Sequence, residues 1–198
     1  MTQQEQLEKI KIYVHELFSN DATGHDYFHM KRVARLAREI AEKEEADEFI
    51  SEAAAWLHDV GDKKLFLNRE KALDDMNQFL LEVSLTKEQV KMINRAIEDV
   101  SYSKGKIPQT IEGKIVQDAD RIDAIGAIGI ARTFAYGGAN GQLIYHDDET
   151  ERSATSIQHF YDKLLKLCDL MHTTTAKNIA EQRHLFMKKY LNQFKMEW

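Results

Sequence analysis

Several residue types are scarce in this sequence of 198 residues, and each scarcity excludes a class of protein. Cysteine occurs once, at Cys168, so the chain has neither an intrachain disulfide framework nor a zinc site built from several thiolates. Proline also occurs once and glycine nine times, which favours a mostly helical structure. No apolar run approaches the roughly eighteen residues of a membrane span, and the polar first residues do not resemble a secretory signal. We therefore expect a cytoplasmic protein.

The charge balance is acidic and limits the partners that the chain can have. Lys and Arg number 27 against 33 Asp and Glu, which gives a formal net charge of −6. This balance argues against broad nucleic-acid binding, which needs a basic surface. An anionic small molecule is still compatible if a metal ion or a local basic cluster offsets its charge. The length suits one domain, or one domain with an appended helical lobe. We expect a single domain over 1–198, with its motifs within about 20–145 and additional C-terminal helices over 152–195, no membrane partner and no predicted oligomeric state.

Apolar residues recur with helical spacing along most of the chain, and no convincing pair of strands is present. We predict an all-α bundle. Asp47, Thr86 and Thr110 are expected to cap helices, and the glycine-rich and acidic segment 137–151 is expected to form a loop. The predicted helices cover 3–19, 27–45, 47–60, 69–83, 86–101, 111–136, 152–171 and 174–195.

The informative residues are polar groups at positions that should face the core. His29 lies on the apolar stripe that continues through Val33 and Ile40, so its ring should point inward. His58-Asp59 closes an alanine-rich apolar helix, and burying both groups is unfavourable unless something compensates. In the third case, three aspartates interrupt a helix rich in Ile, Val and Ala: Asp118, Asp120 and Asp123.

A divalent cation is one economical way to compensate these buried groups. Two neutral imidazoles and two carboxylates suit Mn²⁺, Fe²⁺, Co²⁺ or Mg²⁺, with Zn²⁺ also compatible, and any remaining position would hold an acidified water. His58 and Asp59 lie about 100° apart on a straight helix, so both reach one ion only at a helix end, before Gly61. A single inward histidine is more often a hydrogen-bonded core residue. The joint occurrence on three apolar helices favours the metal, whereas His146-Asp147 in its polar segment indicates a solvated loop.

The order of these motifs resembles the HD-domain metal-dependent phosphohydrolase superfamily. The resemblance spans about residues 20–145 and is carried by His29, then His58-Asp59, then Ala119-Asp120. The short motifs around these residues resemble those of a subgroup of small bacterial HD hydrolases. These motifs are Gly24-His25-Asp26-Tyr27 with His29 and Arg32-Val33, and the run Gln117-Asp118-Ala119-Asp120-Arg121-Ile122-Asp123-Ala124-Ile125-Gly126-Ala127-Ile128-Gly129-Ile130-Ala131-Arg132.

The resemblance implies one divalent metal, for which Mn²⁺ is our first choice, bound by His29, His58, Asp59 and Asp120. The choice of Asp120 over Asp118 follows the family word Ala-Asp, because helical geometry says only that the two lie about 200° apart and cannot both face one ion. Asp123 lies about 60° from Asp120 on the same helix, so we count it among the residues that surround the metal and substrate.

The same resemblance suggests residues for catalysis. Asp62 matches an acid that positions or activates the attacking water in some relatives, although an exposed acid at the helix end is an equal alternative. Arg121 matches a basic residue that contacts phosphate. Further candidates for binding substrate are Lys63, Lys64, Arg32, Arg132, His25 and Asp26; a solvated turn is the alternative for the lysines, and a helix cap is the alternative for Asp26.

Two departures from the wider family narrow the expected chemistry. No histidine occurs from 59 through 145, which argues against a second, histidine-rich metal position and the bimetallic activities that use one. Val100 stands where some relatives have histidine, so the role of that segment is open; Tyr102 nearby either stacks on a base or, more simply, packs.

The preferred interpretation is hydrolysis of a nucleoside triphosphate to its monophosphate and pyrophosphate, as described for members of the subgroup. Alternative activities are a nucleoside 5′-monophosphate phosphatase and an alarmone hydrolase. A non-catalytic module that senses nucleotides is the alternative from another class, and a purely structural metal ranks last because four ligands leave room on a six-coordinate ion. The base, the sugar and the native metal are not predicted.

Overall fold

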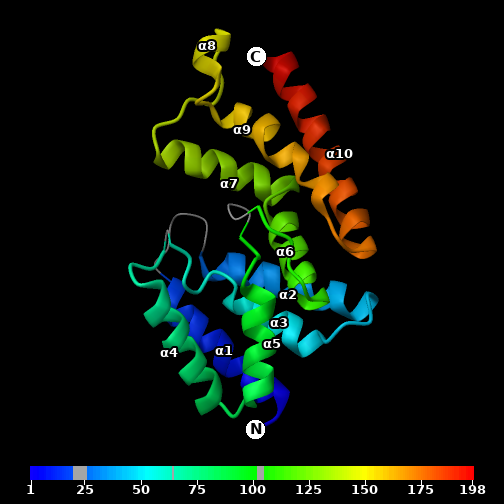
Figure 1. The fold of residues 1–198 in the computed structure, drawn as a ribbon. Coiled ribbons are helices and arrows are strands. Elements are labelled where there is room, and N and C mark those ends of the chain that lie inside the picture. Colours follow the sequence, from blue (N-terminus) through cyan, green and yellow to red (C-terminus); the bar gives the residue numbers. More distant parts are fainter. Residues whose placement is uncertain (20–25, 64, 102–104) are drawn as a thin grey trace. The chain divides into compact units, whose positions relative to one another are not determined.

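The computed structural model describes residues 1–19, 26–63, 65–101 and 105–198, and the regular elements in these ranges are all helical, as Figure 1 shows. The predicted all-α fold is therefore confirmed. None of the helices in the described ranges has the length and apolar character needed to cross a membrane. The elements are α1 (Gln3–Phe18), α2 (Tyr27–Lys43), α3 (Glu48–Leu57), α4 (Arg69–Glu82), α5 (Lys87–Ile97), α6 (Ile111–Asp123), α7 (Gly126–Ala139), α8 (Glu149–Arg152), α9 (Ser156–Asp162), η2 (Leu164–Lys166), η3 (Cys168–Leu170) and α10 (Thr174–Glu197).

The chain divides into two compact units, Met1–Ala119 and Asp120–Trp198, which we call unit 1 and unit 2. The division falls inside α6, so residues 111–119 of this helix belong to unit 1 and its last turn to unit 2. The single domain expected from the sequence stays a prediction.

Unit 1 is organised around α3, which packs against α1, α2 and α5. Every residue from Phe49 to Leu57 is buried, because this helix is apolar on almost all sides and has neighbours on several of them. The stripe of α2 that contains Val33 and Ile40 is buried as its spacing predicts. The residues that follow the C-terminal end of α3 are therefore attached to a helix that is buried along almost its whole length.

Side-chain caps fix where the helices of unit 1 begin. Asp47 accepts a hydrogen bond from the Ile50 amide, and Thr86 forms a capping box with Gln89. The Thr110 hydroxyl accepts from the Gly113 amide. These three predicted caps are confirmed.

Unit 2 is built on the long helix α10, which packs against α7, while α7 also contacts α9. Its interior contains an aromatic cluster in which Phe160 stacks on Tyr190, and Phe134 contacts both rings. At the C-terminal end of α10 the Trp198 indole donates a hydrogen bond to Asp147 at 2.9 Å. This contact joins α10 to the segment between α7 and α8.

The prediction of one helix over 111–136 is wrong, because the structure contains two helices, α6 and α7, separated at Ala124 and Ile125. Gly126 opens α7 with a φ of +78°, a left-handed conformation that side chains other than glycine adopt at a cost. The Arg183 side chain packs about 3.0 Å from where a Gly126 Cβ would lie, so the position is both strained and crowded for other residues.

The prediction of one helix over 152–171 is also wrong. Thr155 ends one helical segment and begins the next, because its hydroxyl donates to the Arg152 carbonyl and accepts from the Gln158 amide. α9 then stops at Asp162, and two short 3₁₀ turns, η2 and η3, follow it. The predicted loop over 137–151 is confirmed only for residues 140–148, since α7 and α8 occupy its two ends.

Candidate metal centre

The His58-Asp59 pair lies at a helix end, as its chemistry requires. α3 ends at Leu57, His58 is its C-terminal cap, and the chain then turns tightly to Gly61, whose φ is +81°. At this end the two side chains leave the spacing of a straight helix. His58 Nε2 lies 3.4 Å from the Asp59 Oδ1 atom, so both groups face the same point.

The tautomer of His58 follows from its hydrogen bond. Its Nδ1 lies 2.8 Å from the Ala55 carbonyl oxygen, which can only accept. Nδ1 must therefore carry the proton, and in the neutral ring Nε2 presents a lone pair. A backbone carbonyl that orients a histidine in this way is the usual outer partner of a metal-ligating imidazole.

His29 is held in the first turn of α2 and is completely buried. The Asp26 carboxylate caps this helix by accepting from the His29 amide at 2.7 Å, so the capping role left open for Asp26 is what the structure shows. The His29 ring meets the His58 ring edge to face, with centroids 5.4 Å apart. α2 and α3 thus bring two imidazoles together in the interior of unit 1.

Asp59 lies between the two imidazoles. Its carboxylate oxygens are 3.8 Å from His29 Nε2 and 3.4 Å from His58 Nε2, distances beyond the usual hydrogen-bond range. Ligand atoms that share an ion through bonds of about 2.1 Å lie roughly 3.0–3.4 Å apart in tetrahedral or octahedral sites. The distances from the Asp59 oxygens to the two imidazole nitrogens are close to this range, so small side-chain movements would bring the three groups to ligand spacing around a cation.

The remaining predicted ligand is Asp120, which directly follows residues 111–119 on α6. In the described part of the chain, His29, His58 and Asp120 each offer one ligand atom, and these atoms all lie within 4.8 Å of one another. Two other candidates are not in this group: Asp118, the alternative that helical geometry left open, and Asp59, which the resemblance implies as a fourth ligand. The donor chemistry, two imidazoles with carboxylates, fits a divalent ion of the kind bound by mixed nitrogen and oxygen ligands.

The other candidates in unit 1 lie on or near the same elements. Asp62 is partly exposed in the turn after α3, where its amide donates to the Asp59 carbonyl at 3.0 Å. Lys63 is exposed, and Arg32 is partly buried on α2. His25, Lys64 and Tyr102 lie outside the described residues.

The candidates in unit 2 bind to one another or to the backbone of that unit. Asp123 is buried and forms an ion pair with Arg132, Nη1 to Oδ2, at 2.8 Å. Arg121 is buried, and its Nη1 donates to the Leu170 carbonyl oxygen and lies 3.2 Å from His172 Nε2. Sequence reasoning missed Leu170 and His172, because contacts across 49 and 51 residues leave no local pattern.

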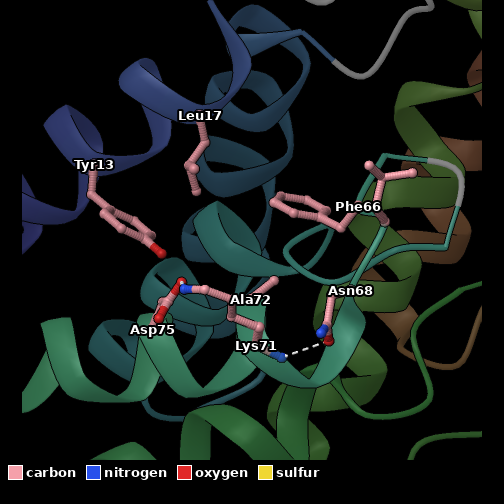
Figure 2. A pocket seen from close by; sticks show the side chains of 8 residues that line it. Tyr13, Leu17, Phe66, Asn68, Lys71, Ala72 and Asp75 are labelled. Atoms are coloured by element: carbon pink, nitrogen blue, oxygen red, sulfur yellow. Dashed lines mark hydrogen bonds and ion pairs between the residues drawn. The ribbon is translucent and has the colours of Figure 1, made fainter.

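A pocket of about 220 Å³ elsewhere in unit 1 does not share the donor chemistry of the metal centre. Figure 2 shows this pocket, which is lined by residues of α1, α4 and the segment before α4. Its lining contains no histidine, and its one carboxylate, Asp75, pairs with Lys71 at 2.6 Å. Tyr13 also lines it, and burial, with the nearby Asp75 charge, raises the pKa of this phenol. Among the described residues, the set that could share a metal ion is instead His29, His58 and Asp120.

The HD domain family model matches residues 26–125, and the chain belongs to this family. HD domains bind divalent metals, and the chain is an HD-superfamily metal-dependent phosphohydrolase. YpgQ of Bacillus subtilis (strain 168) is 40% identical over 100% of this chain and 96% of its own.

Two solved structures of relatives agree with this assignment. The crystal structure of Bacillus subtilis YpgQ in complex with ADP has a TM-score of 0.87 and 41% identity, and the match covers 100% of this chain and 97% of that one. An HD-superfamily hydrolase from Bacillus thuringiensis has a TM-score of 0.84 and 44% identity, with 100% and 98% covered. These matches extend over the whole chain, well beyond the part that the family model covers.

Proposed function

We propose that the protein hydrolyses small nucleotides, and that its preferred reaction converts a nucleoside triphosphate and water into the monophosphate and pyrophosphate. The observation that carries the proposal is the cluster of His29, His58 and Asp120 in a member of the HD family. The complex of YpgQ with ADP supports a nucleotide as the substrate class. The formal net charge of −6 is compatible with a small substrate whose charge the site itself offsets.

The four proposed metal ligands are His29, His58, Asp59 and Asp120, and Mn²⁺ is the first ion to test. When bound, such an ion supplies a Lewis acid for a phosphoryl oxygen and makes a coordinated water more acidic. The Ala55 carbonyl oxygen holds the His58 proton on Nδ1, so Nε2 is the ring nitrogen whose lone pair would bind the ion. Asp59 contributes negative charge next to both imidazoles.

Asp62 is proposed to orient the attacking water and to accept its proton. The backbone of Asp62 is tied to Asp59 through the amide-to-carbonyl bond of the turn, so the two carboxylates are carried by one short segment. Replacing the acid by an isosteric amide tests this role, because general-base assistance typically contributes roughly 10²–10⁴-fold. We expect Asp62→Asn to lower kcat by about 10²-fold with unchanged metal content; full turnover would remove Asp62 from the mechanism.

Arg121 is proposed to offset the charge that develops on the phosphates, with help from Lys63 and Arg32. A planar guanidinium presents paired donors to phosphate oxygens, whereas a lysine acts as a point charge. Asp123 and Arg132 are proposed to support this part of the site through their ion pair. The same proposal places the enzyme in the cytoplasm.

The decisive experiment is a screen of metal-stripped protein. The protein would be reconstituted in turn with Mn²⁺, Mg²⁺, Fe²⁺ and Co²⁺ and incubated with nucleoside mono-, di- and triphosphates, and every product would be identified. Pyrophosphate together with a monophosphate is the expected result. Orthophosphate with a nucleoside would instead indicate a 5′-monophosphate phosphatase, and pyrophosphate released from a 3′ position would indicate an alarmone hydrolase. If the protein bound nucleotides tightly but hydrolysed none of those tested, it would be a non-catalytic module that senses nucleotides.

A further inference from the structure

The guanidinium of Arg121 is held by a short segment of unit 2 that no sequence motif marks. Its Nη1 donates to the Leu170 carbonyl oxygen, and the same nitrogen lies 3.2 Å from His172 Nε2. The segment between these acceptors joins η3 to α10 and is anchored on both sides. Met171 is buried, and Thr173 caps α10 by accepting from the Ala176 amide.

The chemistry of this contact fixes the state of His172. A guanidinium has only N–H donors, so His172 Nε2 must accept, and the ring must be neutral with its proton on Nδ1. A protonated or Nε2–H imidazole would place a donor against a donor. Because the guanidinium is planar and rigid, two acceptors on one of its amines also restrict the plane of the whole group.

We propose that His172 is a positioning residue: it sets the plane of the Arg121 guanidinium so that this group presents its donors to substrate phosphate in one orientation. The kinetic part of the inference depends on the proposed function, whereas the hydrogen bond itself does not. A phosphate clamp needs this restriction, because two parallel N–H donors match two phosphate oxygens only when the fork is correctly oriented.

A measurement that is independent of activity tests the hydrogen bond. Histidine ¹⁵N NMR of the full-length chain, without paramagnetic metal, distinguishes the two neutral tautomers, and His172→Gln identifies the signal. We expect His172 to show a protonated Nδ1 and a bare Nε2, and the Nε2 shift to move in Arg121→Lys. An Nε2–H tautomer, or a signal that Arg121→Lys leaves unchanged, would overturn the inference even if nucleotide hydrolysis is established.

Kinetics test whether the hydrogen bond serves catalysis. His172→Phe keeps a ring but removes the acceptor, and we expect kcat/KM to fall about 10-fold, as for a lost charge-assisted hydrogen bond. His172→Gln offers a carbonyl oxygen in its place and should recover most of that loss. Metal content measured on each variant separates this effect from damage to the metal centre.

A double-mutant cycle distinguishes positioning from a merely structural role. If His172 acts through Arg121, adding His172→Phe to Arg121→Lys should cause almost no further loss in kcat/KM. Fully additive losses, or a failure of His172→Gln to restore activity, would overturn the positioning role. If no nucleotide is hydrolysed with any metal, the proposed function and the kinetic role of His172 both fail. The NMR result then still decides whether His172 accepts a hydrogen bond from Arg121.

Discussion

The two units treat buried polar groups differently. In unit 1, His29, His58 and Asp59 gather at distances beyond hydrogen bonding, and the imidazole atom of His58 that faces Asp59 is an acceptor. In unit 2, the buried acid Asp123 meets the cation Arg132 at 2.8 Å. Two acceptors facing one another are stabilised by an added cation, whereas an acid and a base neutralise each other. Clusters of hydrogen-bond acceptors therefore mark a place that suits a cation, and an acid paired with a base marks a structural contact.

The largest expected effect comes from removing a metal ligand from unit 1. Asp59→Asn keeps the shape of the side chain but removes its charge, and we expect activity to fall by roughly 10³-fold or more because the ion is bound weakly. Metal affinity should fall in parallel, which isothermal titration calorimetry with Mn²⁺ would measure.

The chain contains a matched control for this prediction in the second His-Asp pair. Asp147 is exposed and accepts a hydrogen bond from the Trp198 indole, so Asp147→Asn should leave metal affinity and activity nearly unchanged. Equal metal binding by Asp59→Asn and the native protein would remove Asp59 from the ligand set and break the comparison between the units.

The next effect is on stability and concerns the ion pair of unit 2. Asp123→Asn removes the charge that compensates Arg132, and because Asp123 is only 1% exposed we expect the free energy of unfolding to fall by about 2–3 kcal/mol. Urea denaturation would measure the loss. The control is Asp75→Asn, which breaks the exposed pair with Lys71 and should cost less than about 1 kcal/mol. If both variants lost the same stability, burial would not distinguish the two pairs.

A smaller loss of stability is expected at the turn that carries His58 and Asp59. Gly61→Ala adds a Cβ at a φ of +81°, where it would lie 3.2 Å from the Leu73 side chain, so we expect a loss of about 1–2 kcal/mol. Gly141→Ala in unit 2 has a similar φ of +68° but meets open space. The difference between the two variants in thermal or urea unfolding measures the steric part, and no difference would mean that the turn yields to the new methyl group.

The smallest effect concerns the pocket of Figure 2, the region of unit 1 without metal donors. Burial raises the pKa of Tyr13, so the folded protein holds this proton at a pH where the unfolded chain releases it. The stabilisation is present below the usual phenol pKa of about 10 and is lost as pH rises past it. The native protein should therefore lose stability relative to Tyr13→Phe between about pH 9 and 11. A constant difference in unfolding free energy over this range would contradict the assignment.

The helical fold and the inward placement of His29 lay within reach of sequence reasoning because both depend on local pattern, whereas the full set of proposed ligands, with Asp120 chosen over Asp118, came from the family resemblance. His29 stands on a stripe with Val33 and Ile40, and burial of that stripe follows from its period. The placement of His58 before Gly61 likewise predicted a helix end, which the structure contains.

The helix boundaries that sequence reasoning missed have identifiable physical causes. Apolar residues recur with helical spacing from Ile115 through Ile125 and on into α7, so their spacing alone gave no sign of the break, although Gly126 offered a signal. Thr155 was equally visible as a residue that caps helices. The bonds of Arg121 to Leu170 and His172 had no such signal, because they depend on how distant segments pack.

The burial of α3 ties the chemistry of the protein to its folding. Two of the proposed ligands, His58 and Asp59, directly follow α3, the helix against which α1, α2 and α5 pack in unit 1. An ion at this site would bind the native chain and scarcely the unfolded one, so its binding free energy would add to the free energy of unfolding. Scarcity of the metal would then deprive the cell of catalyst and of folded protein together.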